Sequence, residues 1–274
     1  MKELISKVGG RVIPESCDSK EEYLMYLRHL FAYQFAKDMI PQNGFVLEVG
    51  CGEGYGTNLL SQHAGKIIGL DVDENTIAHA SKKYHSENCI FEVYDGVRIP
   101  YNDNTFDAVI SFQVIEHLQN DISYISEICR VLKVNGFLIL TTPNRTCRLK
   151  SGQKPWNRFH VREYAPHELD HVLKSKFSDV KVWGIRGNEE VQEIEMERVR
   201  QVLKIVSFDY FNLRKLIPEP LKPVVIKVLR KIVRRNQKSN NDGDFLNRYS
   251  LKDFFVVKNN VRDSLDLLGI CRKR

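Results

Sequence analysis

A glycine-rich segment near residue 50 has the residue types and spacing of a ligand-binding turn. In VLEVGCGEGYG, Gly50 and Gly52 flank Cys51 directly after an apolar run. Glycine permits a tight turn and lets a ligand approach the backbone, where any Cβ would obstruct it. A dinucleotide site requires G-x-G-x-x-G to fit a pyrophosphate, but Tyr55 occupies the position of the third glycine. With Gly54 the pattern is instead G-x-G-x-G, which argues against a pyrophosphate ligand.

Three carboxylates near the expected ends of apolar runs accompany this turn. Glu48 precedes the turn, where it would repel a diphosphate and would suit a ligand that carries an ammonium group. Asp71, in IIGLDVDE, follows about 20 residues later, where a carboxylate can accept hydrogen bonds from both ribose hydroxyls. Asp95, in FEVYDG, would lie within reach of a purine amino group, and an Asp-Gly turn is the alternative. Together they predict a site for a nucleoside with an amino-acid tail and no phosphate.

Histidines offer groups for acid–base or metal chemistry. His117 follows the fourth expected strand, on the side of the sheet where doubly wound folds place their ligands. HELDH, residues 167–171, matches the H-E-x-x-H zinc pattern, but such a site also needs a third ligand and an open cleft. PHELDHVLKSKF instead indicates a surface helix whose apolar residues face the core. We therefore predict no metal site.

Short apolar runs alternate with helical patterns from Phe45 onward, and these elements must position the site. Seven runs are expected strands: Phe45–Cys51, Lys66–Val72, Cys89–Asp95, Phe106–Phe112, Phe137–Thr142, Val180–Ile185 and Phe254–Val257. Their β-branched and aromatic residues are typical of strands that are buried on both faces of a parallel sheet. The alternation predicts an α/β fold with a Rossmann-like, doubly wound, seven-stranded sheet.

The remaining segments predict additions to this sheet. Residues 1–44 would form an N-terminal helical cap over the ligand cleft, with its helix at about Lys20–Met39. Residues 45–187 and 251–274 would form the Rossmann-like domain. Residues 188–250 would be a helical insert before the last strand.

The insert contains a basic stretch, residues 222–235, in which apolar and basic residues recur at helical spacing. This pattern indicates an amphipathic helix packed on the core or, alternatively, a helix that contacts a membrane surface or a polyanion.

Composition restricts the class of protein and its location. The 274 residues are 42% hydrophobic and 28% charged, as in soluble globular proteins. The net charge of +6 is mildly basic and falls short of a nucleic-acid signature, so we expect no nucleic-acid partner. The six scattered cysteines form no C-x-x-C pair and indicate reduced thiols. Without a signal-like apolar segment at its start or a run of ~18 apolar residues, the chain is expected to be cytoplasmic, with peripheral membrane contact as an option.

From about Phe45 to Phe177 the sequence resembles the class I S-adenosylmethionine-dependent methyltransferases, and within them the type 11 group. FDAVISFQVIEHLQN, RVLKVNGFLILTTPN and NRFHVREYAPHEL occur in the order expected for this family. The N-terminal helix also looks like that of a subgroup associated with sugar or glycan methylation, which opens with H-x-x-R-Y-x-F-A. His29, Tyr33, Phe35 and Ala36 match this motif, but Ala32 stands at the arginine position.

The resemblance implies a donor site for S-adenosylmethionine. Glu48 would approach the methionine amino group, and the turn Gly50–Gly54, with Cys51 and Gly52, would line the methionine tail. Asp71 would hold the ribose. The remaining contacts would come from Val72 packing on adenine, Asp95 and Gly96 reading the adenine edge, and Phe112 and Gln113 near the sulfonium.

The resemblance also implies where the methyl acceptor binds. His160, in WNRFHVREY after the fifth strand, would border the acceptor pocket. His117 or His160 could therefore serve as a base if the acceptor is a hydroxyl or an amine. We predict methylation, at oxygen, of a small-molecule, sugar or lipid-precursor acceptor. The alternatives are a non-methyl transfer, such as aminopropyl transfer from the decarboxylated donor, and a non-catalytic nucleoside-binding or assembly protein.

Overall fold

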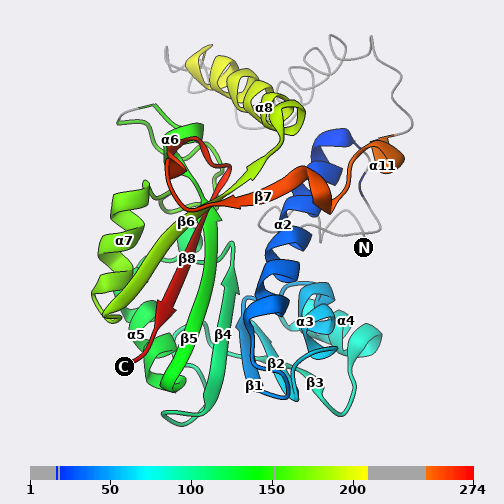
Figure 1. Cartoon of the computed structure of the whole chain (residues 1–274), viewed down its shortest axis with the longest axis vertical. Helices are drawn as coiled ribbons and strands as arrows, with labels where there is room; N and C mark the ends of the chain where they lie inside the picture. The colour runs from blue at the N-terminus through cyan, green and yellow to red at the C-terminus, as the bar shows by residue number, and fades with distance from the viewer. Residues whose placement is uncertain (1–16, 18, 151, 209–244) are drawn as a thin grey trace, which may run out of the picture.

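The computed structural model describes residues 17, 19–150, 152–208 and 245–274, and in them an eight-stranded mixed sheet forms the centre (Figure 1). The strand order is β3-β2-β1-β4-β5-β8-β6-β7. The parallel part consists of β1 Phe45–Val49, β2 Lys66–Asp71, β3 Cys89–Val93, β4 Phe106–Phe112 and β5 Leu132–Pro143. The antiparallel pairings involve β6 Asp179–Gly187, β7 Phe254–Val257 and β8 Asp266–Arg272. The predicted Rossmann-like α/β fold is confirmed.

The predicted number of seven strands is wrong, because the sequence analysis missed β8. This strand, DLLGICR, pairs with β5 on one side and with β6 on the other, so that Ile270 lies opposite both Ile139 and Lys181. Its place in the sheet depends on pairing with two segments far away in the sequence, which a local pattern does not show. Phe254–Val257 is a strand as predicted, but it lies at the edge of the sheet.

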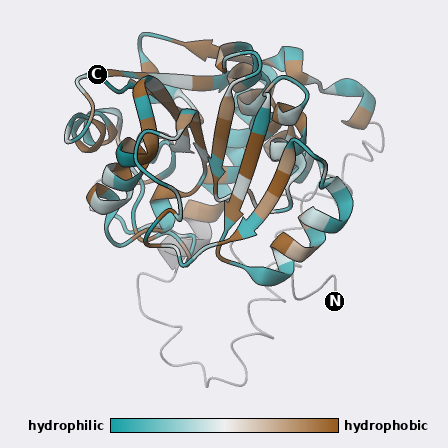
Figure 2. Cartoon of the chain, turned by 90° about the horizontal axis from the view of Figure 1, so that it is seen from below, coloured by the Kyte–Doolittle hydropathy of each residue, from teal (hydrophilic) through white to brown (hydrophobic). Residues whose placement is uncertain are grey.

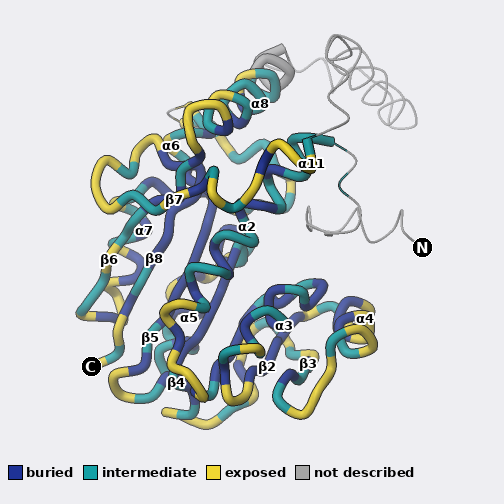
Figure 3. Tube along the Cα trace, turned by 45° about the vertical axis from the view of Figure 1, so that its right-hand side comes forward, coloured by how far each residue is buried: buried dark blue, intermediate teal, exposed yellow. Residues whose placement is uncertain are grey.

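Helices cover both faces of the sheet. On one face lie α2 Lys20–Met39, α3 Tyr55–Ser61 and α4 Glu74–Tyr84. On the other lie α5 Asp121–Val131 and α7 Pro166–Lys174. Successive residues of β1 alternate between the two cores, with Val46 on the first side and Leu47 on the second. The central strands are accordingly mostly apolar and largely buried (Figures 2 and 3).

Two helices far apart in the sequence lie beyond the carboxyl ends of the central strands (Figure 1). The first, α2, has the bounds that the sequence predicted, and its N-cap Ser19 accepts a hydrogen bond from the Glu22 N–H. The second, α8 Glu189–Phe208, packs against it. Shorter elements complete the described chain: η2 Ile115–His117, α6 Arg145–Arg148, α11 Phe245–Arg248, η5 Leu251–Asp253 and η6 Val261–Asp263.

Two other predictions concern segments outside the sheet. The HELDH segment forms α7, with Leu169 and Leu173 buried and both histidines exposed, so the surface-helix interpretation is confirmed. The basic stretch 222–235 lies outside the described residues. Among the described helices, none combines the length and the apolarity of a membrane-spanning segment. The proposed domain boundaries near residues 44, 187 and 250 remain predictions.

Candidate active site

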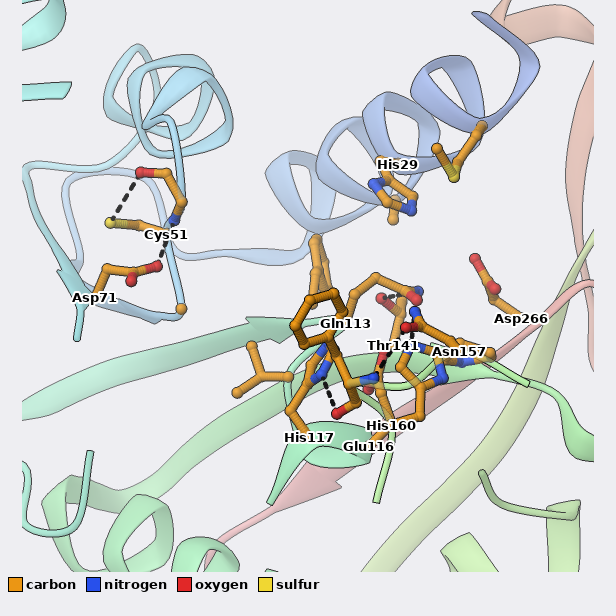
Figure 4. Close-up of a pocket in the computed structure, with 18 of the residues that line it drawn as sticks. His29, Cys51, Asp71, Gln113, Glu116, His117, Thr141, Asn157, His160 and Asp266 are labelled. Carbon is orange, nitrogen blue, oxygen red and sulfur yellow. Dashed lines mark hydrogen bonds between the residues drawn. The ribbon is translucent and has the colours of Figure 1, made fainter. Parts of the chain in front are cut away.

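A cavity of about 550 Å³ opens at the carboxyl ends of the parallel strands, between the sheet and α2 (Figure 4). Its two sides differ in origin. The side that we call the turn side consists of Gly50, Cys51, Gly52, Asp71, Val72 and Gly96. The side that we call the histidine side consists of Arg28, Glu116, His117, Arg148, His160 and Asp266. The crevice at strand ends is where doubly wound folds bind their ligands.

The glycine turn combines close packing with an open approach to the cavity. Gly50 and Gly52 have φ values of 80° and 52°, in the left-handed region that favours glycine. The N–H groups of Gly50 and Cys51 both donate to the carbonyl oxygen of Leu70 on β2, at 2.7 and 2.9 Å. A Cβ on Gly50 would lie 2.3 Å from Cγ2 of Val114, whereas a Cβ on Gly52 would meet no atom within 4 Å. The turn therefore leaves space in front of Gly52 for a ligand.

Asp71 ties the end of β2 to this turn. One carboxylate oxygen accepts from the Gly52 N–H at 3.0 Å, and the other accepts from the Asp73 N–H at 3.1 Å. Val72 follows with 58% of its surface exposed, and it lines the cavity beside Gly96. This pair suits a ligand with two parts: a flat ring that packs on the exposed valine, and a polar group that binds the anchored carboxylate.

Three of the residues that were predicted to bind the methyl donor do not line the cavity. Asp95 is exposed, and one of its oxygens accepts from the N–H groups of Val97 and Arg98, each at 2.8 Å. These backbone hydrogen bonds lower the pKa of Asp95. They are the contacts of an Asx-type turn, the alternative that the Asp-Gly pair suggested. Gly54 packs instead against α4 and β3, since a Cβ there would lie 2.7 Å from both Ala80 and Phe91.

Glu48 is the third, and it is fully buried beneath the turn. Its two carboxylate oxygens accept hydrogen bonds from the hydroxyls of Tyr33 and Thr57, at 2.5 Å each. Burial raises the pKa of Glu48 to about 7, although both hydroxyls act in the opposite direction. Glu48 thus connects β1 to α2 and α3. Its contact with a ligand ammonium group remains a prediction.

Three aromatic residues that line the cavity pack against one another. The ring of Tyr33 on α2 lies 4.9 Å from that of Phe112 and 5.5 Å from that of Tyr55, and all three residues line the cavity. Aromatic faces attract cationic ligand groups. Sequence reasoning did not assign Tyr33 to the site, although its match to the family's N-terminal helix motif was a usable signal.

Gln113 follows Phe112 with a φ of 57°, a conformation that non-glycine residues rarely adopt. Its N–H donates to the Thr141 carbonyl at 2.9 Å, and its side-chain amide donates to the Thr141 hydroxyl at 3.3 Å. Such strained residues cluster at functional sites. The structure thus brings both residues predicted near the sulfonium to the wall of the cavity.

His117 and His160 lie together on the histidine side of the cavity, and their catalytic roles remain predictions (Figure 4). Their ring centroids lie 4.9 Å apart in an edge-to-face arrangement. Nδ1 of His117 lies 2.9 Å from the Phe159 carbonyl oxygen, and Nδ1 of His160 lies 2.8 Å from Oε1 of Glu163. Burial lowers the pKa of His117, so its ring is neutral near pH 7. Both rings are held by their Nδ1 atoms.

Ion pairs between distant segments complete the histidine side. Arg28 on α2 contacts Glu195 of α8 at 3.2 Å and Asp266 of β8 at 2.9 Å, and all three residues are buried. Arg148 pairs with Glu163 at 3.0 Å and stacks on the Trp156 ring, 4.2 Å from its centroid. The sequence analysis missed these residues. No local pattern connects positions separated by 167 residues, as Arg28 and Glu195 are.

Comparisons with known proteins relate the chain to methyltransferases. Residues 47–140 match the family model described as a methyltransferase domain. The chain is 37% identical over 175 residues to a "Probable S-adenosylmethionine-dependent methyltransferase" of Mycolicibacterium smegmatis, covering 63% of this chain and 65% of that protein. It is 32% identical over 121 residues to the mitochondrial ubiquinone biosynthesis O-methyltransferase of Dictyostelium discoideum, covering 39% and 38%.

The aligned part of the chain spans just under two thirds of the length of the mycobacterial relative. Among solved structures, a SAM-dependent methyltransferase of Thermotoga maritima matches with a TM-score of 0.56 over 93% of this chain and 95% of that one. At 15% identity this likeness concerns the fold alone. None of these proteins supports the sugar- or glycan-associated subgroup that the N-terminal helix suggested.

Proposed function

We propose that this chain, whose residues 47–140 are a class I S-adenosylmethionine-dependent methyltransferase domain, methylates an oxygen of a small-molecule, sugar or lipid-precursor acceptor. The supporting observation is one cavity that joins the glycine turn and Asp71 to a pair of histidines. When bound, S-adenosylmethionine supplies the methyl group from its sulfonium.

The turn side fits this donor. The space in front of Gly52 would admit the methionine tail, and the anchored carboxylate of Asp71 would accept the ribose hydroxyls. Val72 and Gly96 would contact the adenine, and the rings of Tyr33 and Phe112 would face the sulfonium. Methyl transfer from a sulfonium requires mainly alignment and exclusion of water. The strand ends would provide the alignment, and the overlying helix α2 would help to exclude water.

The histidine side would take the acceptor, and it offers groups for activating a hydroxyl. Because the Phe159 carbonyl can only accept, His117 donates its Nδ1–H there and keeps a lone pair on Nε2. That lone pair can accept a proton or coordinate a cation. In this proposal His117 and His160 are the catalytic residues that meet the acceptor oxygen.

The test is to incubate the protein with S-adenosylmethionine and a small-molecule extract as the acceptor pool, and to measure S-adenosylhomocysteine. We expect its formation to depend on the extract and to fall at least tenfold in His117→Ala. In a parallel incubation with the decarboxylated donor, aminopropyl transfer would instead consume that donor and release methylthioadenosine. A protein that binds the donor but produces neither compound would favour the non-catalytic alternative.

A further inference from the structure

Three side chains on the histidine side converge in a way that acid–base chemistry alone does not explain (Figure 4). Glu116 and His117 come from η2, and His160 comes from the connection between β5 and β6. Each offers one ligand atom, and the three atoms lie within 4.8 Å of one another. Two imidazoles and one carboxylate are a common ligand set for a divalent transition metal.

Glu116 supplies independent evidence of a missing partner. Only 1% of its surface is exposed, and it lines the cavity. Its Oε2 accepts from the Thr142 hydroxyl at 2.9 Å, but its buried Oε1 has no hydrogen-bond partner among the described residues. Leaving a buried carboxyl oxygen unpaired costs about 1–3 kcal/mol or more. A cation beside His117 and His160 would satisfy this oxygen.

The outer contacts of both histidines suit metal ligands. A metal-bound histidine usually donates its second ring N–H to a carbonyl or a carboxylate. His117 has the Phe159 carbonyl in this position, and His160 has Glu163, which is itself paired with Arg148. Nε2 of His117 is thus left for a cation, whereas Nε2 of His160 already has an amide neighbour. Nδ2 of Asn157, 2.8 Å from Nε2 of His160, is the atom that a cation would displace.

We propose that Glu116, His117 and His160 bind a divalent transition-metal cation, with Zn²⁺ as the best match. Mg²⁺ and Ca²⁺ prefer oxygen ligands throughout, whereas two imidazole nitrogens favour the zinc class. Three protein ligands leave a fourth position open toward the cavity. If the proposed O-methylation is correct, on which this role rests, the acceptor hydroxyl would bind there, and His117 and His160 would act on it through the cation instead of as bases. The cation would lower its pKa, the O–H bond would break, and the proton would pass to water.

Zinc titration of the full-length protein, stripped of metal and saturated with S-adenosylhomocysteine, tests the site. We expect one Zn²⁺ per chain by calorimetry, and no competition from equimolar Mg²⁺. Affinity should fall at least tenfold in His160→Ala and in Glu116→Gln, whereas His171→Ala should bind as wild type. His171 is the matched control, since it belongs to the H-E-x-x-H pattern but is exposed on α7. Melting curves would show whether His160→Ala or Glu116→Gln fails to fold. In that case the zinc affinity of the variant that does fold tests the site.

Absence of one-to-one zinc binding would overturn the proposal, and so would equal affinity in His160→Ala and wild type. Co²⁺ gives a second readout, because its visible absorption should appear on binding and be lost in both variants. The proposed function is measured separately. If S-adenosylhomocysteine binds and methyl transfer occurs in metal-free protein, the catalytic role of the cation is wrong, and the zinc titration alone decides whether the metal site exists. If zinc binds but no methyl transfer is found with any acceptor pool, the proposed function fails and the metal site stands.

Discussion

The turn side and the histidine side of the cavity face each other, but they are assembled in different ways. On the turn side, Gly50, Gly52 and Asp71 come from two neighbouring parallel strands and are held by backbone hydrogen bonds. On the histidine side, Arg28 and Asp266 meet from opposite ends of the chain and are held by buried ion pairs. A site built from local backbone geometry is readable from a motif, whereas one built from long-range charge pairs is not.

The difference also predicts how each side fails. Removing one member of a buried ion pair leaves an uncompensated charge, so damage to the histidine side should appear as lost stability. Most turn-side residues contact the open cavity, so damage there should appear mainly as lost ligand affinity.

Arg28→Ala should have the largest effect. The change leaves Asp266 and Glu195 buried near the cavity without this guanidinium, and we expect the free energy of unfolding to fall by about 3–5 kcal/mol. Urea denaturation measures it. Arg200→Ala is the control, because its pairs with Glu193 and Glu197 are exposed and should contribute little. If the two variants were equally stable, the buried ion pairs of Arg28 would contribute no more to stability than the exposed pairs of Arg200.

Gly50→Ala and Gly52→Ala separate packing from ligand access within the turn. Gly50→Ala places a Cβ against Val114 and should cost about 2 kcal/mol of stability. Gly52→Ala meets open space and should cost only about 1 kcal/mol, from its positive φ. The affinity of Gly52→Ala for S-adenosylhomocysteine, measured by calorimetry, should nevertheless fall at least tenfold. Wild-type affinity in Gly52→Ala would mean that the ligand does not approach this backbone.

Asp71→Ala tests the ribose contact. A hydrogen bond to a charged group contributes about 1.5–3 kcal/mol, so S-adenosylhomocysteine affinity should fall at least tenfold. Because Asp71 also holds the Gly52 N–H, a 2′-deoxy analogue is needed to isolate the ribose. The wild type should discriminate against this analogue, and Asp71→Ala should discriminate much less. Equal discrimination by both proteins would assign Asp71 to the turn alone.

The smallest effect that we expect is a dependence of stability on pH that comes from Glu48. Its pKa of about 7 in the folded protein lies above the ordinary value of 4.5. The folded state therefore binds the proton more tightly, and this stabilisation is present at low pH and lost as the pH rises through 7. From pH 6 to pH 7 the loss should be about 1 kcal/mol. Glu48→Gln cannot titrate and should lack this part of the slope in urea denaturation across that range. If the free energy of unfolding depends on pH equally in Glu48→Gln and in the wild type, the pKa of Glu48 is not raised in the folded protein.

The sequence predicted the elements whose signals are local. It located α2, the five parallel strands and the turn that precedes α3. It missed β8, whose place between β5 and β6 depends on pairing with strands far away in the sequence. The structure shows the carboxylates of Glu48 and Asp95 engaged by Tyr33, Thr57 and a local turn, and their predicted contacts with a ligand remain predictions.

The histidine side shows the same limit. His117 and His160 were predicted from strand order and family resemblance, but nothing in the spacing indicated that Glu116 would join them. The partners of Arg28 could not be predicted either, since Glu195 on α8 and Asp266 on β8 meet it only through the tertiary fold.

Calorimetric titration with S-adenosylhomocysteine tests the central claim, that the turn side binds the product of a methyl donor, most directly. We predict saturable binding of one molecule per chain, and no saturable heat from NAD, because the turn lacks the third glycine that a pyrophosphate requires. Saturable NAD binding, or no binding of S-adenosylhomocysteine to folded protein, would contradict this account.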